Sequence, residues 1–193
     1  MFHIQVIGGK FKGLKLESDK NEKLRPTKDR VKESIFDILQ FQIINKNFVD
    51  AFGGTGQIGI EALSRGANQV TILESNHANV NLINKNIKKI KKRESISVIH
   101  TDVRDFLKNC TETIDIIFLD PPYKQLDLLY ETAYLAEKKM ASDGIIITET
   151  LSEHSVKDKL RNFSLKKKYK YGIISLNLYK IINFTLGCDQ NWK

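Results

Sequence analysis

Short apolar runs alternate with longer amphipathic segments over residues 48 to 150 of this chain. The apolar runs predict strands at residues 48–52, 69–74, 96–100, 114–119 and 144–148. The segments between them predict helices at residues 58–65, 76–91, 103–109 and 126–139. Parallel strands need a crossover connection, which is usually a helix, so this alternation is typical of a parallel sheet covered on both faces. We therefore expect an α/β fold.

The two ends of the chain depart from this alternation. A short helix around residues 154–161 is predicted to lead into two strands, 164–170 and 172–181, that form a hairpin. At the other end, glycine turns in residues 1–18 predict a β-hairpin, and Thr27 is predicted to cap a helix that runs to Leu39. An antiparallel hairpin that finishes a parallel sheet is the order expected of class I methyltransferases, whereas a dehydrogenase domain would end in another strand–helix–strand unit.

The expected architecture is therefore a Rossmann-like, mostly parallel sheet of seven strands with an N-terminal hairpin and helix extension. A chain of 193 residues is most simply one domain. We expect this domain to cover residues 1–181, with the extension in 1–45 and the core in 46–181, and we treat 182–193 as a tail.

A glycine-rich loop joins the first predicted strand of the core to the next helix. Gly54, Gly56 and Gly59 satisfy the G-x-G-x-x-G pattern, which by itself fits a dinucleotide as well as S-adenosylmethionine. Asp50 can face a positive amino group, and Glu74, at the end of the second strand, can accept both ribose hydroxyl protons. We expect this cofactor site to be formed by Asp50, Phe52, Gly53, Gly54, Thr55, Gly56, Glu74, Ser75, Asp102 and Val103.

Asp102 has two possible roles in that site. It follows the third predicted strand, where it could accept a hydrogen bond from an adenine amine. It also directly precedes the helix predicted at residues 103–109, where it could act as the N-cap. Both roles are compatible with each other.

The sequence Asp120-Pro121-Pro122-Tyr123 follows an apolar run, so it is predicted to form a loop at the carboxyl end of a buried strand. Ligands bind at that edge of an open α/β sheet. A carboxylate, the backbone carbonyls of two prolines and an aromatic ring can together hold a planar exocyclic amine and stack on its ring. The plainer interpretation is a strand end followed by a Pro-Pro turn. With this loop present, we expect S-adenosylmethionine rather than a nicotinamide cofactor.

The chain is basic, with a net charge of +8 and a pI near 9.3. Such a charge favours a polyanionic partner, although a genome's base composition can also enrich lysine. We expect no secretion and no membrane insertion, and hence a cytoplasmic protein, because a signal-like segment and a long apolar run are both missing. Cys110 and Cys188 form no ligand spacing with the four histidines, so we expect free thiols and no metal.

Several motifs in one order resemble the RsmD family of bacterial 16S rRNA (guanine-966-N2)-methyltransferases. They are the segments at residues 8–13, 25–33, 50–59, 61–67 and 120–123, and the resemblance extends to about Ile181. It implies transfer of a methyl group from S-adenosylmethionine to the N2 atom of one guanine in 16S rRNA of the small ribosomal subunit or its assembly intermediate. By match with the family's motif, the resemblance implies that the target guanine is held by Asp120, Pro121, Pro122 and Tyr123.

Contacts with RNA are expected from basic or polar residues near the N-terminus: Lys10, Lys12, Arg25, Thr27 and Arg30. We expect a monomer. Two features depart from the family pattern: Gly53 and Gly54 stand where many relatives have Ala or Ser beside the first glycine, and the tail with Cys188 and Trp192 extends past the usual end. The alternatives are an adenine-N6 methyltransferase of DNA or RNA, and a ribosome-assembly factor that binds S-adenosylmethionine without catalysis.

Overall fold

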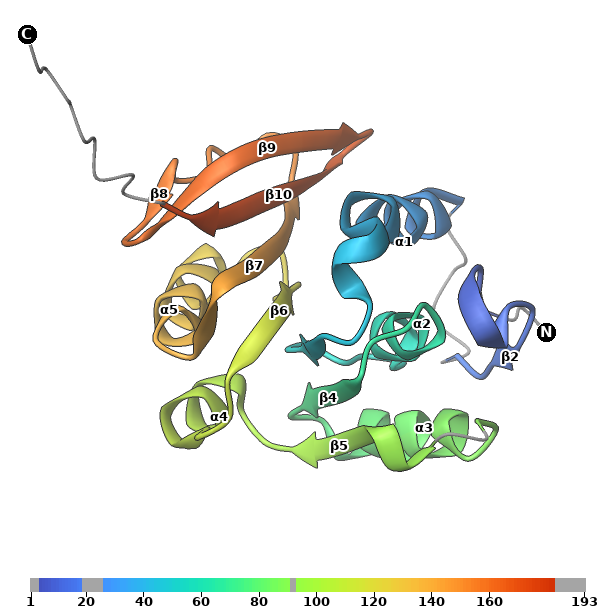
Figure 1. The fold of residues 1–193 in the computed structure, drawn as a ribbon. Coiled ribbons are helices and arrows are strands. Elements are labelled where there is room, and N and C mark those ends of the chain that lie inside the picture. Colours follow the sequence, from blue (N-terminus) through green and yellow to red (C-terminus); the bar gives the residue numbers. More distant parts are fainter. Residues whose placement is uncertain (1–3, 19–25, 91–92, 183–193) are drawn as a thin grey trace, which may run out of the picture.

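The computed structural model describes residues 4–18, 26–90 and 93–182. It contains a small two-stranded sheet and an eight-stranded sheet with the order β5-β4-β3-β6-β7-β10-β9-β8 (Figure 1). The strands are β1 (Ile4–Gln5), β2 (Lys15–Leu16), β3 (Asn47–Asp50), β4 (Gln69–Glu74), β5 (Ile96–His100), β6 (Ile114–Leu119), β7 (Met140–Leu151), β8 (Lys159–Leu160), β9 (Phe163–Tyr171) and β10 (Ile174–Ile181). The helices are α1 (Pro26–Leu39), α2 (Gln57–Ser64), α3 (His77–Ile87), α4 (Val103–Asn109) and α5 (Leu126–Glu137), with 3-10 turns η1 (Gly9–Phe11), η2 (Gln40–Ile43) and η3 (Arg93–Ser95).

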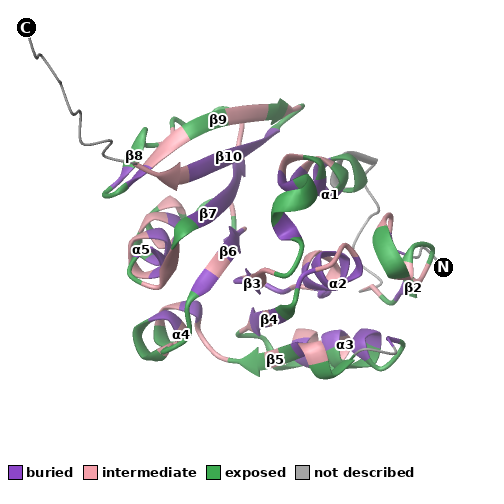
Figure 2. Ribbon diagram, viewed as in Figure 1, coloured by how far each residue is buried: buried purple, intermediate pink, exposed green. Residues whose placement is uncertain are grey.

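The large sheet is parallel from β5 to β7 and antiparallel from β7 through β10 and β9 to β8. Two helical layers cover it: α1, α2 and α3 lie on one face, and α4 and α5 lie on the other (Figure 1). Each face has its own apolar core. The central strands are buried on both faces, which is why their sequences are nearly continuous apolar runs (Figure 2).

Neighbouring residues of a central strand belong to different cores. Phe118 of β6 and Ile147 of β7 pack in the core beneath α1, α2 and α3, whereas Ile117 and Ile146 pack in the core beneath α4 and α5. This alternation follows from the two-residue period of a strand. It also determines which face the residues at the end of each strand point toward.

The N-terminal hairpin of β1 and β2 is fastened to helix α2 by a buried carboxylate. Glu61 is fully buried and accepts hydrogen bonds from the backbone N–H groups of Ile7 (2.8 Å) and Gly8 (2.7 Å). It also accepts one from Arg65 Nε at 2.8 Å. Lys32 of α1 donates to the carbonyl of Gln5 at 2.7 Å, so the hairpin, α1 and α2 form one packed unit.

The α/β class, the predicted strand positions and the closing hairpin are confirmed. The number of strands was wrong, because β8 adds an eighth strand beside β9. The predicted helix at residues 154–161 was also wrong: that segment forms bends and the strand β8. Tertiary contacts hold it extended, since the Lys157 carbonyl accepts from the Tyr179 hydroxyl at 2.9 Å and Leu160 pairs with Phe163.

Smaller differences concern the ends of elements. Helix α1 begins at Pro26, one residue before the predicted cap Thr27, as suits a proline in the first helical position. Helix α3 ends at Ile87 rather than near residue 91, and β7 extends to Leu151 rather than residue 148. Arg25 and residues 183–193, including Cys188 and Trp192, lie outside the described residues. None of the helices in the described ranges is long and apolar enough to cross a bilayer.

Candidate active site

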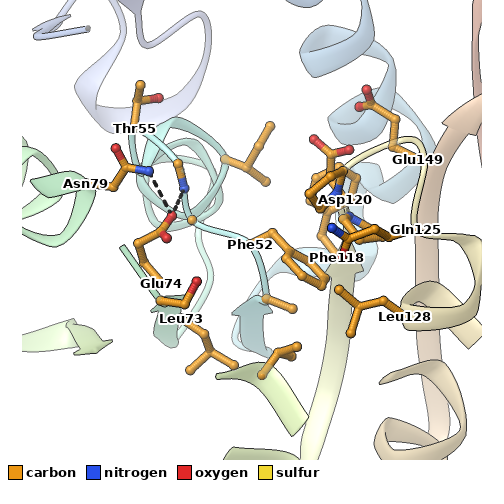
Figure 3. Close-up of a pocket in the computed structure, with 18 of the residues that line it drawn as sticks. Phe52, Thr55, Leu73, Glu74, Asn79, Phe118, Asp120, Gln125, Leu128 and Glu149 are labelled. Atoms are coloured by element: carbon orange, nitrogen blue, oxygen red, sulfur yellow. Dashed lines mark hydrogen bonds between the residues drawn. The ribbon is translucent and has the colours of Figure 1, made fainter. Parts of the chain in front are cut away.

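A cavity of about 920 Å³ opens at the carboxyl ends of the parallel strands, where the sheet topology predicts a ligand site. Its walls come from the loops after β3, β4, β5 and β6, from the end of β7 and from one side of α1. Figure 3 shows two polar groups separated by the ring of Phe52: Glu74, Thr55 and Asn79 on one side, and Asp120, Gln125 and Glu149 on the other. The cavity therefore has two halves, each with its own polar group.

The glycine-rich loop forms the wall of the first half. Gly56 adopts a left-handed conformation with φ of 78° and caps helix α2, which explains why a glycine is needed there. Gly53 donates its N–H to the carbonyl of Leu73 at 2.8 Å, so the loop is fixed against β4. A Cβ atom added at Gly53 would lie 2.5 Å from Ile72 Cγ2 and 3.0 Å from Ile83 Cδ1. Close packing, rather than an unusual backbone angle, requires glycine at position 53.

Replacement of Gly53 by alanine should lower the free energy of unfolding by about 3 kcal/mol, because the new methyl group collides with buried, branched side chains. The matched variant is Gly54→Ala, since Gly54 has a φ of 54° and no atom within 4 Å of an added Cβ. Only backbone strain of about 1 kcal/mol is expected there. Urea unfolding of both variants measures the difference. Equal losses would show that the packing against Ile72 is unimportant.

Glu74, the last residue of β4, is the acidic group of the first half. Its Oε2 atom accepts from Gly54 N at 2.9 Å and from Asn79 Nδ2 at 3.4 Å, and its Oε1 accepts from Asn76 N at 2.7 Å. These bonds hold the carboxylate in the cavity wall beside Ser75, which also lines the cavity. Glu74 therefore lines the cavity, and its contact with a cofactor stays a prediction.

Asp50 is placed differently from the expectation that it faces a ligand's amino group. The side chain is fully buried beneath the glycine loop, and its Oδ2 atom accepts from Gly59 N, in the first turn of α2, at 3.0 Å. It is absent from the residues that line the cavity, as is Gly56. Burial, with a smaller contribution from the nearby charge of Glu74, raises the pKa of the Asp50 carboxyl to about 7.

This raised pKa predicts how stability depends on pH. Between about pH 4 and pH 7 the folded chain keeps the Asp50 proton that the unfolded chain has already lost, so stability falls as pH rises through this window. Asp50→Asn removes that titration and keeps an oxygen for Gly59. From pH 5 to pH 8 the variant should gain about 2 to 3 kcal/mol relative to the wild type, as measured by urea unfolding at both pH values. A constant difference would contradict the buried, protonated carboxyl.

Asp102 lines the cavity and is confirmed as the N-cap of α4. Its Oδ1 accepts from Arg104 N at 2.8 Å, and both carboxylate oxygens accept from the Arg104 guanidinium, at 2.9 and 2.8 Å. Hydrogen bonds from that guanidinium lower the pKa of Asp102. Asp102, Val103 and Arg104 all line the cavity. Recognition of an adenine amine by Asp102 stays a prediction.

The second half is built on the Asp120–Tyr123 loop. Pro121 is buried, Pro122 is exposed, and the Pro122 carbonyl accepts from Gln125 N at 2.8 Å, which closes the turn ahead of α5. The Tyr123 hydroxyl donates to Glu149 Oε1 at 2.7 Å. The loop is thereby tied to β7, and all four of its predicted residues line the cavity.

Two buried, charged residues that line the cavity were missed in the sequence. Glu149 follows the predicted strand at residues 144–148 by one position, and a polar residue after a buried run is the same signal that identified Asp120. Lys32 is buried, and its ammonium group contacts the Gln5 carbonyl at 2.7 Å and Gln57 Oε1 at 3.4 Å. Burial lowers the pKa of Lys32. Lys32 follows Val31 in an ordinary amphipathic helix, so no sequence signal distinguished it from an exposed lysine.

Lys10, Lys12 and Arg30, among the predicted RNA-binding residues, are exposed. Thr27 lies in the first turn of α1 but its side chain is outside the described residues, as is the whole of Arg25. Within the described ranges, no group of three histidine, cysteine or acidic residues comes together in a way that could hold a metal ion.

Comparisons with known proteins identify the family of this chain. A family model described as "conserved hypothetical protein 95" matches residues 4–180. The ribosomal RNA small subunit methyltransferase D of Escherichia coli is 33% identical over 92% of this chain and 89% of its own length. The protein of the same name from Haemophilus influenzae is 35% identical over 92% of this chain and 93% of its own.

Several solved structures have a fold similar to that of this chain. A putative methyltransferase from Escherichia coli superposes with a TM-score of 0.81 and 33% identity, over 93% of this chain and 98% of its own. A putative methyltransferase complexed with SAH superposes with a TM-score of 0.69 at 14% identity, over 82% of this chain and 50% of its own, and so shows the fold alone. The architecture is thus that of class I S-adenosylmethionine-dependent methyltransferases. Because the family model spans nearly the whole chain, this protein belongs to the conserved hypothetical protein 95 family, the RsmD family.

Proposed function

We propose that this protein transfers a methyl group from S-adenosylmethionine to the exocyclic N2 atom of one guanine in 16S rRNA of the small ribosomal subunit. The observation that carries the proposal is the cavity with two halves, one lined by the glycine loop and Glu74, the other by Asp120–Tyr123 (Figure 3). A methyl donor and a planar acceptor can meet there without a further domain.

The residues of the first half fit S-adenosylmethionine. Glu74 presents a carboxylate that can accept both ribose hydroxyl protons, and Phe52 presents an aromatic ring to the cavity. Within the described residues, the buried hydroxyl oxygen of Thr55 has no hydrogen-bond partner. Because a buried polar atom without a partner is costly, this hydroxyl supports a polar ligand beside the glycine loop.

The second half provides the groups that hold a planar amine. S-adenosylmethionine supplies a methyl group on a sulfonium, which is already a good leaving group. Asp120 and the Pro121 carbonyl accept hydrogen bonds from the N2 amine, which draws its lone pair out of the ring and toward the methyl group. Tyr123 stacks on the base, which must be turned out of its helix to enter the cavity. The amine proton leaves during or after transfer. Because the sulfonium is already a good leaving group, positioning of the two reactants supplies most of the rate enhancement.

The choice of rRNA is supported by the names of the relatives and by charge. Both relatives are named as ribosomal RNA small subunit methyltransferases. The chain carries a net charge of +8, and the exposed side chains of Lys10, Lys12 and Arg30 can contact phosphates. We propose that the protein acts as a monomer in the cytoplasm, on the subunit or its assembly intermediate.

Labelled methyl transfer to three substrates tests this proposal: undermethylated small subunits, naked 16S rRNA and duplex DNA. Label should enter the subunits and not the DNA. Transfer to duplex DNA would instead support an adenine-N6 DNA methyltransferase. If none of the three accepts label while S-adenosylhomocysteine still binds, the protein is a non-catalytic binding factor.

A further inference from the structure

We infer that Glu149 selects guanine over adenine by accepting a hydrogen bond from the N1–H of the target base while Asp120 holds its N2 amine. This role rests on the proposed function. It also resolves a choice that the Asp120–Tyr123 loop leaves open, because adenine N6 and guanine N2 are both exocyclic amines and present the same chemistry to that loop.

The fold places the two carboxylates side by side. Strands β6 and β7 are parallel neighbours, and Leu119, the last residue of β6, pairs with Thr148, so Asp120 directly follows β6 and Glu149 is the next residue of β7. Adjacent strands lie about 4.8 Å apart. Phe118 and Ile147, two residues earlier, both face the core beneath α1. By the two-residue period of a strand, Asp120 and Glu149 face the same side, and both line the cavity (Figure 3).

Guanine and adenine present opposite patterns to such a pair. In guanine the N2 amine lies next to N1–H, so two neighbouring groups donate. In adenine the N6 amine lies next to N1, which carries a lone pair and only accepts. An ionised carboxylate is also only an acceptor. Two adjacent carboxylates therefore match guanine, whereas adenine would place its N1 lone pair against Glu149, which is repulsive and leaves both groups unsatisfied.

The surroundings of Glu149 favour a strong preference. The residue is only 8% exposed, and Tyr123 holds its Oε1 atom at 2.7 Å. A buried and oriented carboxylate discriminates more sharply than a solvated one, because water cannot replace the missing partner. A carboxylate has about four acceptor positions, so the bond from Tyr123 is compatible with a bond from the base.

The test compares Glu149→Met with the wild type on small subunits assembled from 16S rRNA that carries either guanine or 2-aminopurine at the methylated position. 2-Aminopurine keeps the N2 amine but has a lone pair at N1 and lacks O6. The wild type should prefer guanine by at least about 100-fold in kcat/KM. In the variant this ratio should fall to within about fivefold, mainly through loss of the reaction with guanine. 2-Aminopurine lacks O6 whichever enzyme acts on it. The change in the guanine to 2-aminopurine ratio between the two enzymes therefore isolates the contact at N1.

Tyr123→Phe provides the matched control, since it removes the Tyr123–Glu149 hydrogen bond and retains both the ring and the carboxylate. Its guanine to 2-aminopurine ratio should stay within about threefold of the wild type, although both rates can fall. An equal collapse of the ratio in both variants would show that Glu149 acts only by holding Tyr123. An unchanged ratio in Glu149→Met would also overturn the inference. Affinity for S-adenosylhomocysteine, measured by calorimetry, should be retained in all three proteins and reports correct folding.

Failure of the proposed function would give a different experimental result from failure of this inference. If the wild type forms no N2-methylguanosine on guanine-containing subunits, the function itself is wrong, and the role of Glu149 is wrong with it. If N2-methylguanosine forms but the ratio does not depend on Glu149, only the present inference fails.

Discussion

Asp120→Ala should reduce kcat/KM for methyl transfer to the small subunit by at least about 10³-fold. Asp120 is the carboxylate that follows β6 at the edge of the cavity, where it can accept from the amine that becomes methylated. Without it, the amine lone pair stays delocalised into the base and the amine is no longer held toward the methyl group. Affinity for S-adenosylhomocysteine should stay within about threefold, because the glycine loop and Glu74 lie in the other half of the cavity (Figure 3).

Asp127→Ala is the matched control for this variant. Asp127 is an exposed acidic residue in the first turn of α5 and is not among the residues that line the cavity. Its removal changes the net charge by the same amount and should leave transfer close to the wild-type rate. Wild-type turnover in Asp120→Ala would contradict the assigned role, and so would an equal loss of activity in Asp127→Ala.

Glu74→Gln should weaken binding of S-adenosylhomocysteine by about 10- to 100-fold. In the folded chain Glu74 accepts from Gly54 N and Asn76 N, and in the proposed function its carboxylate also accepts from the ribose. Glutamine has one acceptor oxygen in place of two and adds an N–H donor, so it cannot keep these bonds and also accept from both ribose hydroxyl groups. Isothermal titration calorimetry measures the loss directly.

Glu112→Gln is the control, because Glu112 is exposed in the loop before β6 and does not line the cavity. Its affinity for S-adenosylhomocysteine should equal that of the wild type. If Glu74→Gln also binds like the wild type, the first half of the cavity is not the ribose site, and the assignment of the two halves would have to change.

The parts of the structure that follow from local sequence could be predicted. Period and length identified the five parallel strands, and the glycines and Asp120–Tyr123 sit at strand ends as expected. Contacts between distant segments were harder to foresee. Residues 154–161 contact α5, β9 and β10, and these contacts hold them out of the predicted helix.

In the functional site, too, features that depend on local sequence were predicted, and features that depend on distant contacts were not. Asp50 was expected to contact a ligand because it ends a strand before the glycine loop, but its side chain lies under that loop and accepts from Gly59. Glu149 was missed although it follows a buried run as Asp120 does, because β7 continues to Leu151 only through its pairing with β10, which local sequence does not reveal. Both cases depend on which face of the sheet a side chain occupies, and that is decided by the packing of the whole domain.

Nuclease digestion and mass spectrometry of 16S rRNA, taken from small subunits after incubation with the wild-type protein and S-adenosylmethionine, identify the base and the atom that are methylated. The added methyl group should appear as N2-methylguanosine at one position of the rRNA. The appearance of N6-methyladenosine instead, or of methyl groups spread over many guanines, would contradict a cavity that holds one extruded guanine between Asp120 and Tyr123.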